Sequence, residues 1–462
     1  MILTALILLA EGVLCNLLLS PDANTNADNV AVLLLIINIA VVSFGISYSL
    51  GKTAKPDSDK VKHIVIGSFI LRIAVLLWDV YARNIYILPN SEGDAEWYHI
   101  IGERYAFGSL ANEVNLNRYS YYVGLLYKFI GSQKLTAQFL NVFLAICSII
   151  IIYKILCLLN IDSDIRVRTM LVAAFLPNLI MITTFMLQES VIAFLSISSF
   201  YYFIRWWNGR NYVNILFALI LSAAASVLHM GGLIVGLGAL VSIFLVNKDR
   251  KLAITPLRIG LMIVAGFVGV YLLTTQGDLF LAKLGGDISA ESIVENASLK
   301  ESGGGVYNIG ISGLPPSVDL IVNTPIRMVY FIFSPLPWMW RGVNDIIAFV
   351  GSTIFYIVVI YFAIKAIRRR PAKAIDDSKL LSVLISLIII LIMATIMFGW
   401  GTSNSGTALR HREKFTYLFI VLFAVSQEII FRVNKQNEKN SIDNSSGLQR
   451  RKVSSKMHHF YR

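Results

Sequence analysis

The residues best suited to chemistry lie in one short stretch, SEGDAEWYHIIGER, at positions 91–104. On a helix, Asp94 and Tyr98 share a face because they are four residues apart, as do Glu96 and His99, which are three apart. A carboxylate in this setting can act as a general base that removes a proton from an acceptor hydroxyl. A solvated surface helix with ordinary charge pairs is the competing interpretation.

A second group of charged side chains comprises Arg410, His411 and Arg412, which follow the turn GTSNSG at 401–406. Guanidinium groups bind phosphate through paired hydrogen bonds and stay charged at any relevant pH. We therefore predict that this group binds a phosphate. The alternative is that the side chains contact lipid head groups at the membrane boundary.

Three further residues are candidates because of their positions. Glu189 stands between two apolar segments, where ionisable side chains are functional candidates by default. His229 occupies a short turn of the same kind, and Trp338, in a proline-rich stretch, could stack on a sugar ring. Glu189 could instead favour the start of a helix, His229 could be structural, and Trp338 could belong to an interfacial aromatic belt.

These residues must be positioned by a membrane protein. The chain has 462 residues, of which 56% are hydrophobic and 15% charged, against roughly 45–50% and about 25% in soluble domains. This composition excludes a soluble globular enzyme, a disordered chain and a secreted disulfide scaffold. The three cysteines lie in apolar segments without metal-ligand spacing, so neither a metal nor a cofactor is expected.

The fold class predicted from the apolar runs is an all-α polytopic membrane protein with about 12 transmembrane helices. The predicted spans are 3–20, 30–50, 63–82, 135–158, 169–187, 189–206, 212–228, 231–246, 256–275, 345–367, 379–400 and 414–432. Short apolar stretches at Tyr121–Ile130 and Ile326–Leu336 cannot span and are predicted to be interfacial or re-entrant helices.

The net charge of +12 is explained by topology. Lys and Arg collect in alternate loops, at 52–62, 166–168, 205–210, 248–258 and 365–379, and in the tail after Arg432. Because positively charged loops face the cytoplasm, both termini are predicted to be cytoplasmic. The excess charge therefore gives no reason to expect a nucleic acid partner.

This topology divides the chain into five regions. Residues 1–62 hold two N-terminal spans, and 63–275 form a core that includes the first outer loop, 83–134. A second outer loop at 276–344 is followed by three C-terminal spans in 345–432 and a basic disordered cytoplasmic tail, 433–462. The outer loops are large enough to form a site on a membrane scaffold.

Four motifs in order give the chain a resemblance to a known family. They are Asp94…Tyr98 in the first outer loop, Pro177-Asn178 followed by Gln188-Glu189, YFIFSPLPW at 330–338, and GTALRHR at 406–412. The pattern resembles GT-C-type polytopic membrane glycosyltransferases, which take sugars from polyprenyl-phosphate or polyprenyl-diphosphate carriers. It departs from that family in placing the acidic motif after the third predicted span and in reading Asp-Ala-Glu.

The resemblance implies a glycosyltransferase of bacterial surface polysaccharide assembly (O-antigen, capsule or exopolysaccharide), in the plasma membrane with its site on the outer side. Asp94 is the expected general base, with Glu96 or Glu189 as a backup base or a positioning carboxylate, so which carboxylate is the base stays open. The remaining expected contacts are donor phosphate binding by Arg410, His411 and Arg412, and substrate binding by Tyr98, His99, Trp338 and His229. The expected partners are the polyprenyl-linked sugar or oligosaccharide, membrane lipids and other polysaccharide assembly proteins.

Two alternatives stay open at this point. A repeat-unit polymerase of the Wzy kind would use the same chemistry with two lipid-linked oligosaccharides. A lipid-linked oligosaccharide flippase or other secondary transporter would instead need a polar cavity at mid-bilayer depth.

Overall fold

The structure is a computed structural model that describes residues 27–52, 55–108, 117–245, 255–256, 258, 305–307, 309, 316–369 and 375–460. Within these ranges the secondary structure is helical and contains no β-strand. The predicted span 3–20, and almost all of the predicted span 256–275, lie outside the described residues.

Six described helices are long and apolar enough to cross a membrane, which confirms a polytopic all-α membrane protein. They are Leu34–Gly51 within α2 (Ala27–Gly51), α3 (Ser58–Tyr81), α6 (Lys134–Leu158), the continuous run Val343–Arg368, Lys379–Trp400 within α18 (Ile375–Trp400), and Thr416–Glu438 within α20 (Thr416–Phe460). The run Val343–Arg368 comprises α16 (Val343–Ala348), a π-helical turn η3 (Phe349–Thr353) and α17 (Ile354–Arg368). The count of twelve is not reached among the described residues.

The predicted span 169–187 is a bent pair of shorter helices. They are α7 (Ser163–Phe175) and α8 (Pro177–Thr184), which meet at 52°. Pro177 lacks a backbone N–H and forces the preceding residue out of the helical conformation, and Leu176 is accordingly extended, with ψ of 116°. The sequence pattern therefore located the apolar segment but missed its break.

The next three predicted spans are also helical, but none is among the six. They form α9 (Gln188–Gly209), α10 (Tyr212–Leu228), and the short 3-10 turn η1 (Met230–Leu233) that leads into α11 (Ile234–Leu245). The chain reverses direction between α9 and α10 at Arg210, which adopts a left-handed conformation with φ of 55°.

Five shorter helical elements lie in or beside the predicted outer segments. They are α4 (Asp94–Ala106), α5 (Arg118–Ile130), α15 (Pro316–Phe333), the 3-10 turn η2 (Pro337–Met339) and α19 (Ser405–Glu413). Helix α5 covers the apolar stretch Tyr121–Ile130, and α15 covers Ile326–Leu336 as far as Phe333. The segment 401–413 was expected to be a turn, yet most of it is α19, because Asn404 accepts a hydrogen bond from the Gly406 N–H and so caps a new helix.

Helix α6 lies at the centre of the bundle and is buried along most of its length. Buried polar residues tie neighbouring helices to one another. In α3, Arg72 donates to the Ala174 carbonyl at 2.9 Å, and Asp79 accepts from Gln138 of α6 at 2.7 Å. These two in-span charges therefore hold helices together, as polar groups inside membrane bundles commonly do.

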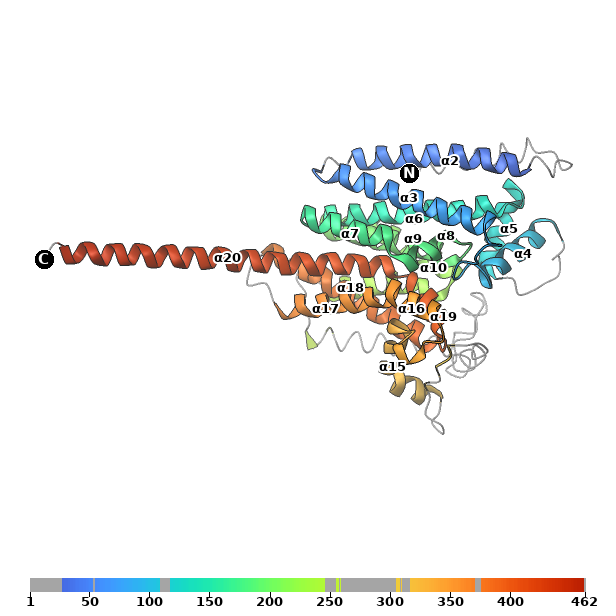
Figure 1. The fold of residues 1–462 in the computed structure, drawn as a ribbon. Helices are drawn as coiled ribbons and strands as arrows, with labels where there is room; N and C mark the ends of the chain where they lie inside the picture. The colour runs from blue at the N-terminus through green and yellow to red at the C-terminus, as the bar shows by residue number, and fades with distance from the viewer. Residues whose placement is uncertain are drawn as a thin grey trace.

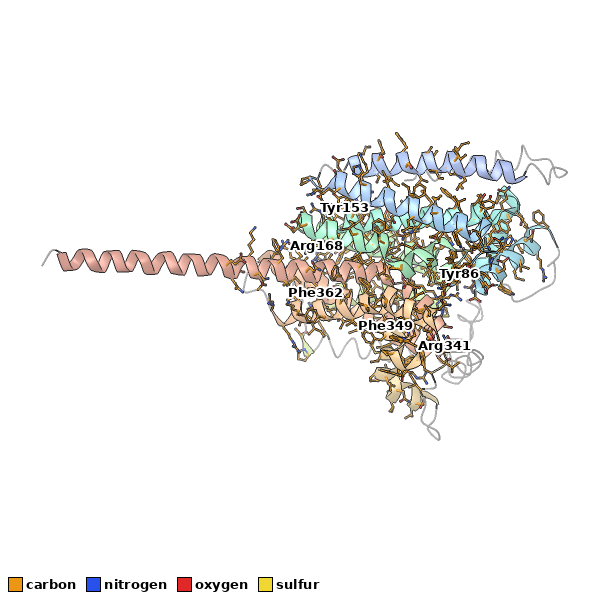
Figure 2. The ribbon with its side chains drawn as sticks, viewed as in Figure 1. Tyr86, Tyr153, Arg168, Arg341, Phe349 and Phe362 are labelled. Atoms are coloured by element: carbon orange, nitrogen blue, oxygen red, sulfur yellow. The ribbon has the colours of Figure 1, made fainter. Side chains whose placement is uncertain are left out.

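The bundle has two distinct ends (Figures 1 and 2). Helix α20 projects from one end, toward which Arg168 lies, whereas Tyr86 and Arg341 lie toward the other end, where Figure 1 labels α4 and α19. The loops predicted to lie on opposite sides of the membrane thus lie at opposite ends of the bundle. The tail 433–462 was expected to be disordered, but it contains no proline and α20 continues through it to Phe460.

Candidate functional site

Three residues predicted from the sequence meet at the end of the bundle away from the projecting part of α20. A fourth residue, which was not predicted, lies with them. Arg410 Nη1 lies 2.5 Å from Asp94 Oδ2, and Arg410 Nη2 lies 3.3 Å from Glu189 Oε1. Lys414 Nζ is 3.7 Å from the same Glu189 oxygen. We call Asp94, Glu189, Arg410 and Lys414 the Arg410 cluster. It joins segments that are up to 316 residues apart in sequence.

Helix ends account for the placement of these charges. Asp94 and Glu189 lie in the first turns of α4 and α9, where the partial positive charge of a helix N-terminus favours carboxylates. Arg410 lies in the last turn of α19, where the opposite helix end favours a cation. The cluster therefore forms where two helix N-termini meet one C-terminus.

The turn that leads into Glu189 is held by a buried amide of α6. Asn141 Nδ2 donates to the carbonyl oxygens of Phe185 at 2.6 Å and Leu187 at 3.2 Å, and Ser190 Oγ donates to the Asn141 carbonyl at 3.1 Å. These bonds satisfy backbone groups between α8 and α9 that no helix serves. Asn141 thus fixes the position of the buried carboxylate.

The start of α19 is held by the second outer segment. The Tyr307 N–H donates to the Ser403 carbonyl at 2.8 Å, and the Ser405 N–H donates to the Gly305 carbonyl at 3.0 Å. Gly305 has φ of 92°, which a residue with a side chain rarely adopts. The two outer segments therefore converge on the helix that carries Arg410.

In the Arg410 cluster the guanidinium contacts two carboxylates, of which one is accessible to solvent and the other is not. The Asp94 side chain is 54% exposed, that of Arg410 is 20% exposed, and that of Glu189 is fully buried. Burial disfavours the charge of Arg410, but the nearby Glu189 and Asp94 raise its pKa above the ordinary value. Among the described residues, Glu189 Oε2 and Arg410 Nε have no hydrogen-bond partner.

Tyr98 borders the cluster, as its position four residues after Asp94 predicts. Its ring packs edge-to-face against Tyr119, with the centroids 4.9 Å apart, and it is 3% exposed. Burial and the nearby charge of Glu189 both raise the pKa of Tyr98, so its phenol is neutral at physiological pH. A neutral phenol there can donate or accept a hydrogen bond at the edge of the site.

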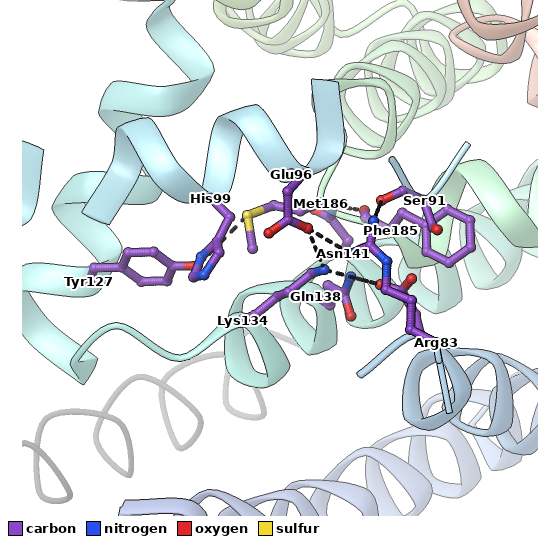
Figure 3. Close-up of polar contacts among 11 residues, drawn as sticks. Arg83, Ser91, Glu96, His99, Tyr127, Lys134, Gln138, Asn141, Phe185 and Met186 are labelled. Atoms are coloured by element: carbon purple, nitrogen blue, oxygen red, sulfur yellow. Dashed lines mark hydrogen bonds and ion pairs between the residues drawn. The ribbon is translucent and has the colours of Figure 1, made fainter. Parts of the chain in front are cut away.

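The other two candidates of α4 belong to a separate network (Figure 3). Glu96 Oε2 lies 2.6 Å from Arg83 Nη1 and 3.0 Å from Lys134 Nζ. His99 Nδ1 is 2.7 Å from the Tyr127 hydroxyl, and burial lowers the pKa of His99. Glu96 is thus paired with cations that follow α3 and begin α6, whereas Asp94 is the carboxylate of this helix that contacts Arg410.

This pairing predicts a pH effect on stability. Burial alone would raise the pKa of Glu96, but hydrogen bonds from Arg83 and Lys134 outweigh it and lower that pKa. The stabilisation is therefore present above the unfolded-state pKa of about 4.3 and is lost as the pH falls through the lower folded-state value. We expect the melting temperature of Glu96→Gln to fall less steeply than wild type between about pH 5 and pH 3.

Thermal unfolding in detergent at stepped pH measures this difference. Glu92→Gln, which removes an exposed carboxylate nearby, should keep the wild-type pH dependence. The same acid sensitivity in Glu96→Gln and wild type would show that the Glu96 ion pairs do not stabilise the fold.

Arg412 lies outside the Arg410 cluster, in a buried network of its own. It is 1% exposed and donates to the carbonyls of Ile332 at 2.6 Å and Ser334 at 2.7 Å, and to Ser352 Oγ at 3.1 Å. Its guanidinium also lies over the Tyr356 ring at 5.0 Å. Successive helical residues are about 100° apart, so Arg410 and Arg412 point to different sides of α19. These contacts give Arg412 a packing role against the 330–338 motif, and its part in donor phosphate binding stays a prediction.

Arg412→Ala should consequently reduce stability. Truncation leaves several buried acceptors without a donor, at about 1–3 kcal/mol for such a group, so we expect the free energy of unfolding to drop by about 2–3 kcal/mol. Folded yield and thermal unfolding in detergent measure the effect. A variant that unfolds like wild type but has lost all activity would place Arg412 in the reactive site.

The two histidines lie against each other beside the cluster. The His229 and His411 rings are edge-to-face at 5.1 Å, and His229 stacks on Phe398 at 4.9 Å. The Gly231 N–H donates to His229 Nδ1 at 3.2 Å, so the imidazole also caps the turn after α10. Gly231 packs so closely on Phe398 that a Cβ would lie 2.0 Å from the ring. His229 therefore has a packing role next to His411.

Trp338 is 72% exposed in η2, where its ring can contact either a substrate or the membrane boundary. Both interpretations made from the sequence therefore stay predictions.

Two buried charged residues at the end of α19 were not predicted from the sequence. They are Glu413 and Lys414. Lys414 is buried, pairs with Glu189 and lies 5.1 Å from the Phe398 ring centroid. The sequence feature that could have identified Lys414 is its spacing of four residues from Arg410. Glu413 is buried and accepts from Asn178 Nδ2 at 2.6 Å and from Thr416 Oγ1 at 2.7 Å, although burial raises the pKa of its carboxyl group. This contact explains why Asn178, noticed in the sequence, matters to the arrangement.

The chain matches no family model, no curated protein and no solved structure in the comparisons made with each. Within the described ranges, no three His, Cys, Asp or Glu side chains are grouped as a metal site would require. The functional interpretation therefore depends on the geometry of the site.

Proposed function

We propose that this protein is a membrane glycosyltransferase that moves a sugar or oligosaccharide from a polyprenyl-phosphate or polyprenyl-diphosphate carrier to a glycan acceptor. The observation that carries the proposal is the contact of one guanidinium, Arg410, with both Asp94 and Glu189. An accessible base beside a half-buried cation that can bind phosphate is what sugar transfer from an anionic carrier requires.

In the proposed reaction the Asp94 carboxylate takes the proton of an acceptor hydroxyl. The hydroxyl oxygen attacks the anomeric carbon of the donor sugar, and the bond from that carbon to the carrier phosphate oxygen breaks. The carrier leaves as a phosphate anion with the bonding electron pair. A single displacement of this kind inverts the anomeric configuration.

Arg410 is proposed to bind the leaving phosphate by exchanging one of its partners. Asp94 is exposed and can be displaced from Arg410, whereas Glu189 is fully buried and would keep the guanidinium in place. A bound phosphate would therefore release the Asp94 carboxylate for proton transfer. Lys414 adds positive charge beside the same Glu189 oxygen that Arg410 contacts.

Burial within the cluster supports this division of roles. Arg410 remains charged because the two carboxylates raise its pKa, and an ionised donor makes the stronger hydrogen bonds to phosphate. A transporter would be expected to place such groups at mid-bilayer depth. The Arg410 cluster instead lies at helix ends, outside the six candidate spans.

The proposal is tested in cells whose surface glycan can be separated on a gel. Asp94→Ala and Arg410→Ala should each abolish the glycan product at normal protein level. Loss of one sugar from the lipid-linked unit would indicate a transferase, and a single repeat without a ladder would indicate a polymerase. Normal glycan from both variants would refute the site.

A further inference from the structure

A groove of about 440 Å³ lies between α6, α9 and α10. Its wall is mainly aliphatic and aromatic and includes Phe143, Ile150, Ile151, Phe194, Tyr201 and Leu221. The volume and apolar character are those of a site that binds a small molecule or a hydrocarbon chain. None of these residues takes part in the Arg410 cluster.

Two polar side chains in the groove point to the kind of ligand that it binds. Ser198 is only 5% exposed, lines the groove, and its hydroxyl has no hydrogen-bond partner among the described residues. Lys154 also lines the groove and has no carboxylate partner in the part of the chain that the structure describes. A buried unpaired hydroxyl and an unpaired cation are both costly unless a ligand satisfies them.

The helices show where the polar end of the groove lies. Ser190 Oγ donates to the Asn141 carbonyl at one end of the α6–α9 pair, and Asn208 Nδ2 donates to the Leu158 carbonyl at the other, so the two helices run parallel. Asn141 supports the turn that carries Glu189. Lys154 is 13 residues further along α6, hence about 20 Å away.

A second cation, Arg205, lies at the same end of the α6–α9 pair as Lys154. The Arg205 guanidinium is 5.9 Å from the ring centroid of Tyr201 and 5.8 Å from that of Tyr202, and both tyrosines line the groove. The groove therefore has an apolar part toward the middle of α6 and positive charge toward the end opposite the Arg410 cluster.

We propose that this groove binds one anionic phospholipid of the membrane. Its acyl chain would lie along Phe143 and Phe194, an ester oxygen would accept a hydrogen bond from Ser198, and its phosphate would lie by Lys154 and Arg205. The charge-lined end lies on the side predicted to be cytoplasmic. The lipid would bind whether or not the Arg410 cluster transfers a sugar.

Native mass spectrometry of the full chain in detergent tests this proposal, after incubation with phosphatidylglycerol or phosphatidylcholine of identical chain length. Wild type should retain phosphatidylglycerol more tightly than phosphatidylcholine. Lys154→Gln should weaken phosphatidylglycerol binding by about fivefold, the effect of one cation near a lipid phosphate. It should weaken phosphatidylcholine binding less, because the choline group offsets the charge of that phosphate. Ser198→Phe, which fills the groove, should weaken both lipids.

Lys60→Gln, which removes an exposed lysine of α3, is the matched control and should bind both lipids like wild type. Thermal unfolding of each variant verifies that it is folded. Equal phosphatidylglycerol retention by Lys154→Gln and wild type would overturn the proposal. Failure of wild type to retain either lipid would do the same. So would displacement of the bound lipid by polyprenyl phosphate but not by excess phosphatidylglycerol.

Discussion

Asp94→Asn is expected to lower the rate of sugar transfer by about 10²–10⁴-fold, the usual contribution of a general base, while the protein stays folded. The amide has the shape of the carboxylate and can still accept a hydrogen bond from Arg410, but it cannot take a proton. The Asp94 side chain is 54% exposed, so its replacement should leave packing unchanged. The measurement is transfer from an extracted polyprenyl-linked glycan by the purified variant.

Two nearby carboxylates serve as controls for Asp94→Asn. Glu92→Gln should retain full transfer, because Glu92 is an exposed neighbour. Glu96→Gln should retain most of it, because Glu96 is paired with Arg83 and Lys134 instead. If Glu96→Gln lost transfer and Asp94→Asn did not, the base would be Glu96, the alternative that the sequence had left open.

Arg410→Ala is expected to lower transfer by about 10²–10³-fold, the loss typical of removing one donor that stabilises transition-state charge. The leaving phosphate would lose the guanidinium that joins Asp94 and Glu189. Lys414 would still compensate the buried Glu189, so the fold should survive. Transfer kinetics and thermal unfolding of the same preparation separate these effects.

Arg410→Lys provides a graded test of the same residue. It keeps the charge but loses the planar pair of donors, so it should recover part of the lost activity. Arg168→Ala, which changes an exposed arginine toward the other end of the bundle, should have wild-type kinetics. Full activity in Arg410→Ala would remove this residue from phosphate binding.

The spans were the most predictable feature of the chain. Runs such as 135–158 are long and apolar, and a chain in lipid must satisfy its backbone hydrogen bonds internally, so such runs become helices. The break at Pro177 was less predictable, because a proline within an apolar run can bend a helix or end it. The helix that contains Arg410 was missed because its cap, Asn404, was read as part of a turn.

The site was predictable in its members but not in their grouping. Asp94, Glu189 and Arg410 were all candidates, yet charge and spacing alone did not distinguish Arg410 from Arg412. Side chains two positions apart on a helix point about 200° apart, and only tertiary packing decides which side faces the site. The same reasoning separates Asp94 from Glu96, whose ion pairs lie with α3 and α6.

Release of the lipid carrier by the purified protein is the most direct measure of the central claim. Polyprenyl-linked glycans extracted from cells that carry the Asp94→Asn variant would be given to purified wild-type protein, and free polyprenyl phosphate or diphosphate would be followed by mass spectrometry. The account predicts that wild type releases the carrier and elongates the glycan, whereas Asp94→Asn and Arg410→Ala do not. Folded wild-type protein that releases no carrier, or variants that release it at the wild-type rate, would contradict it.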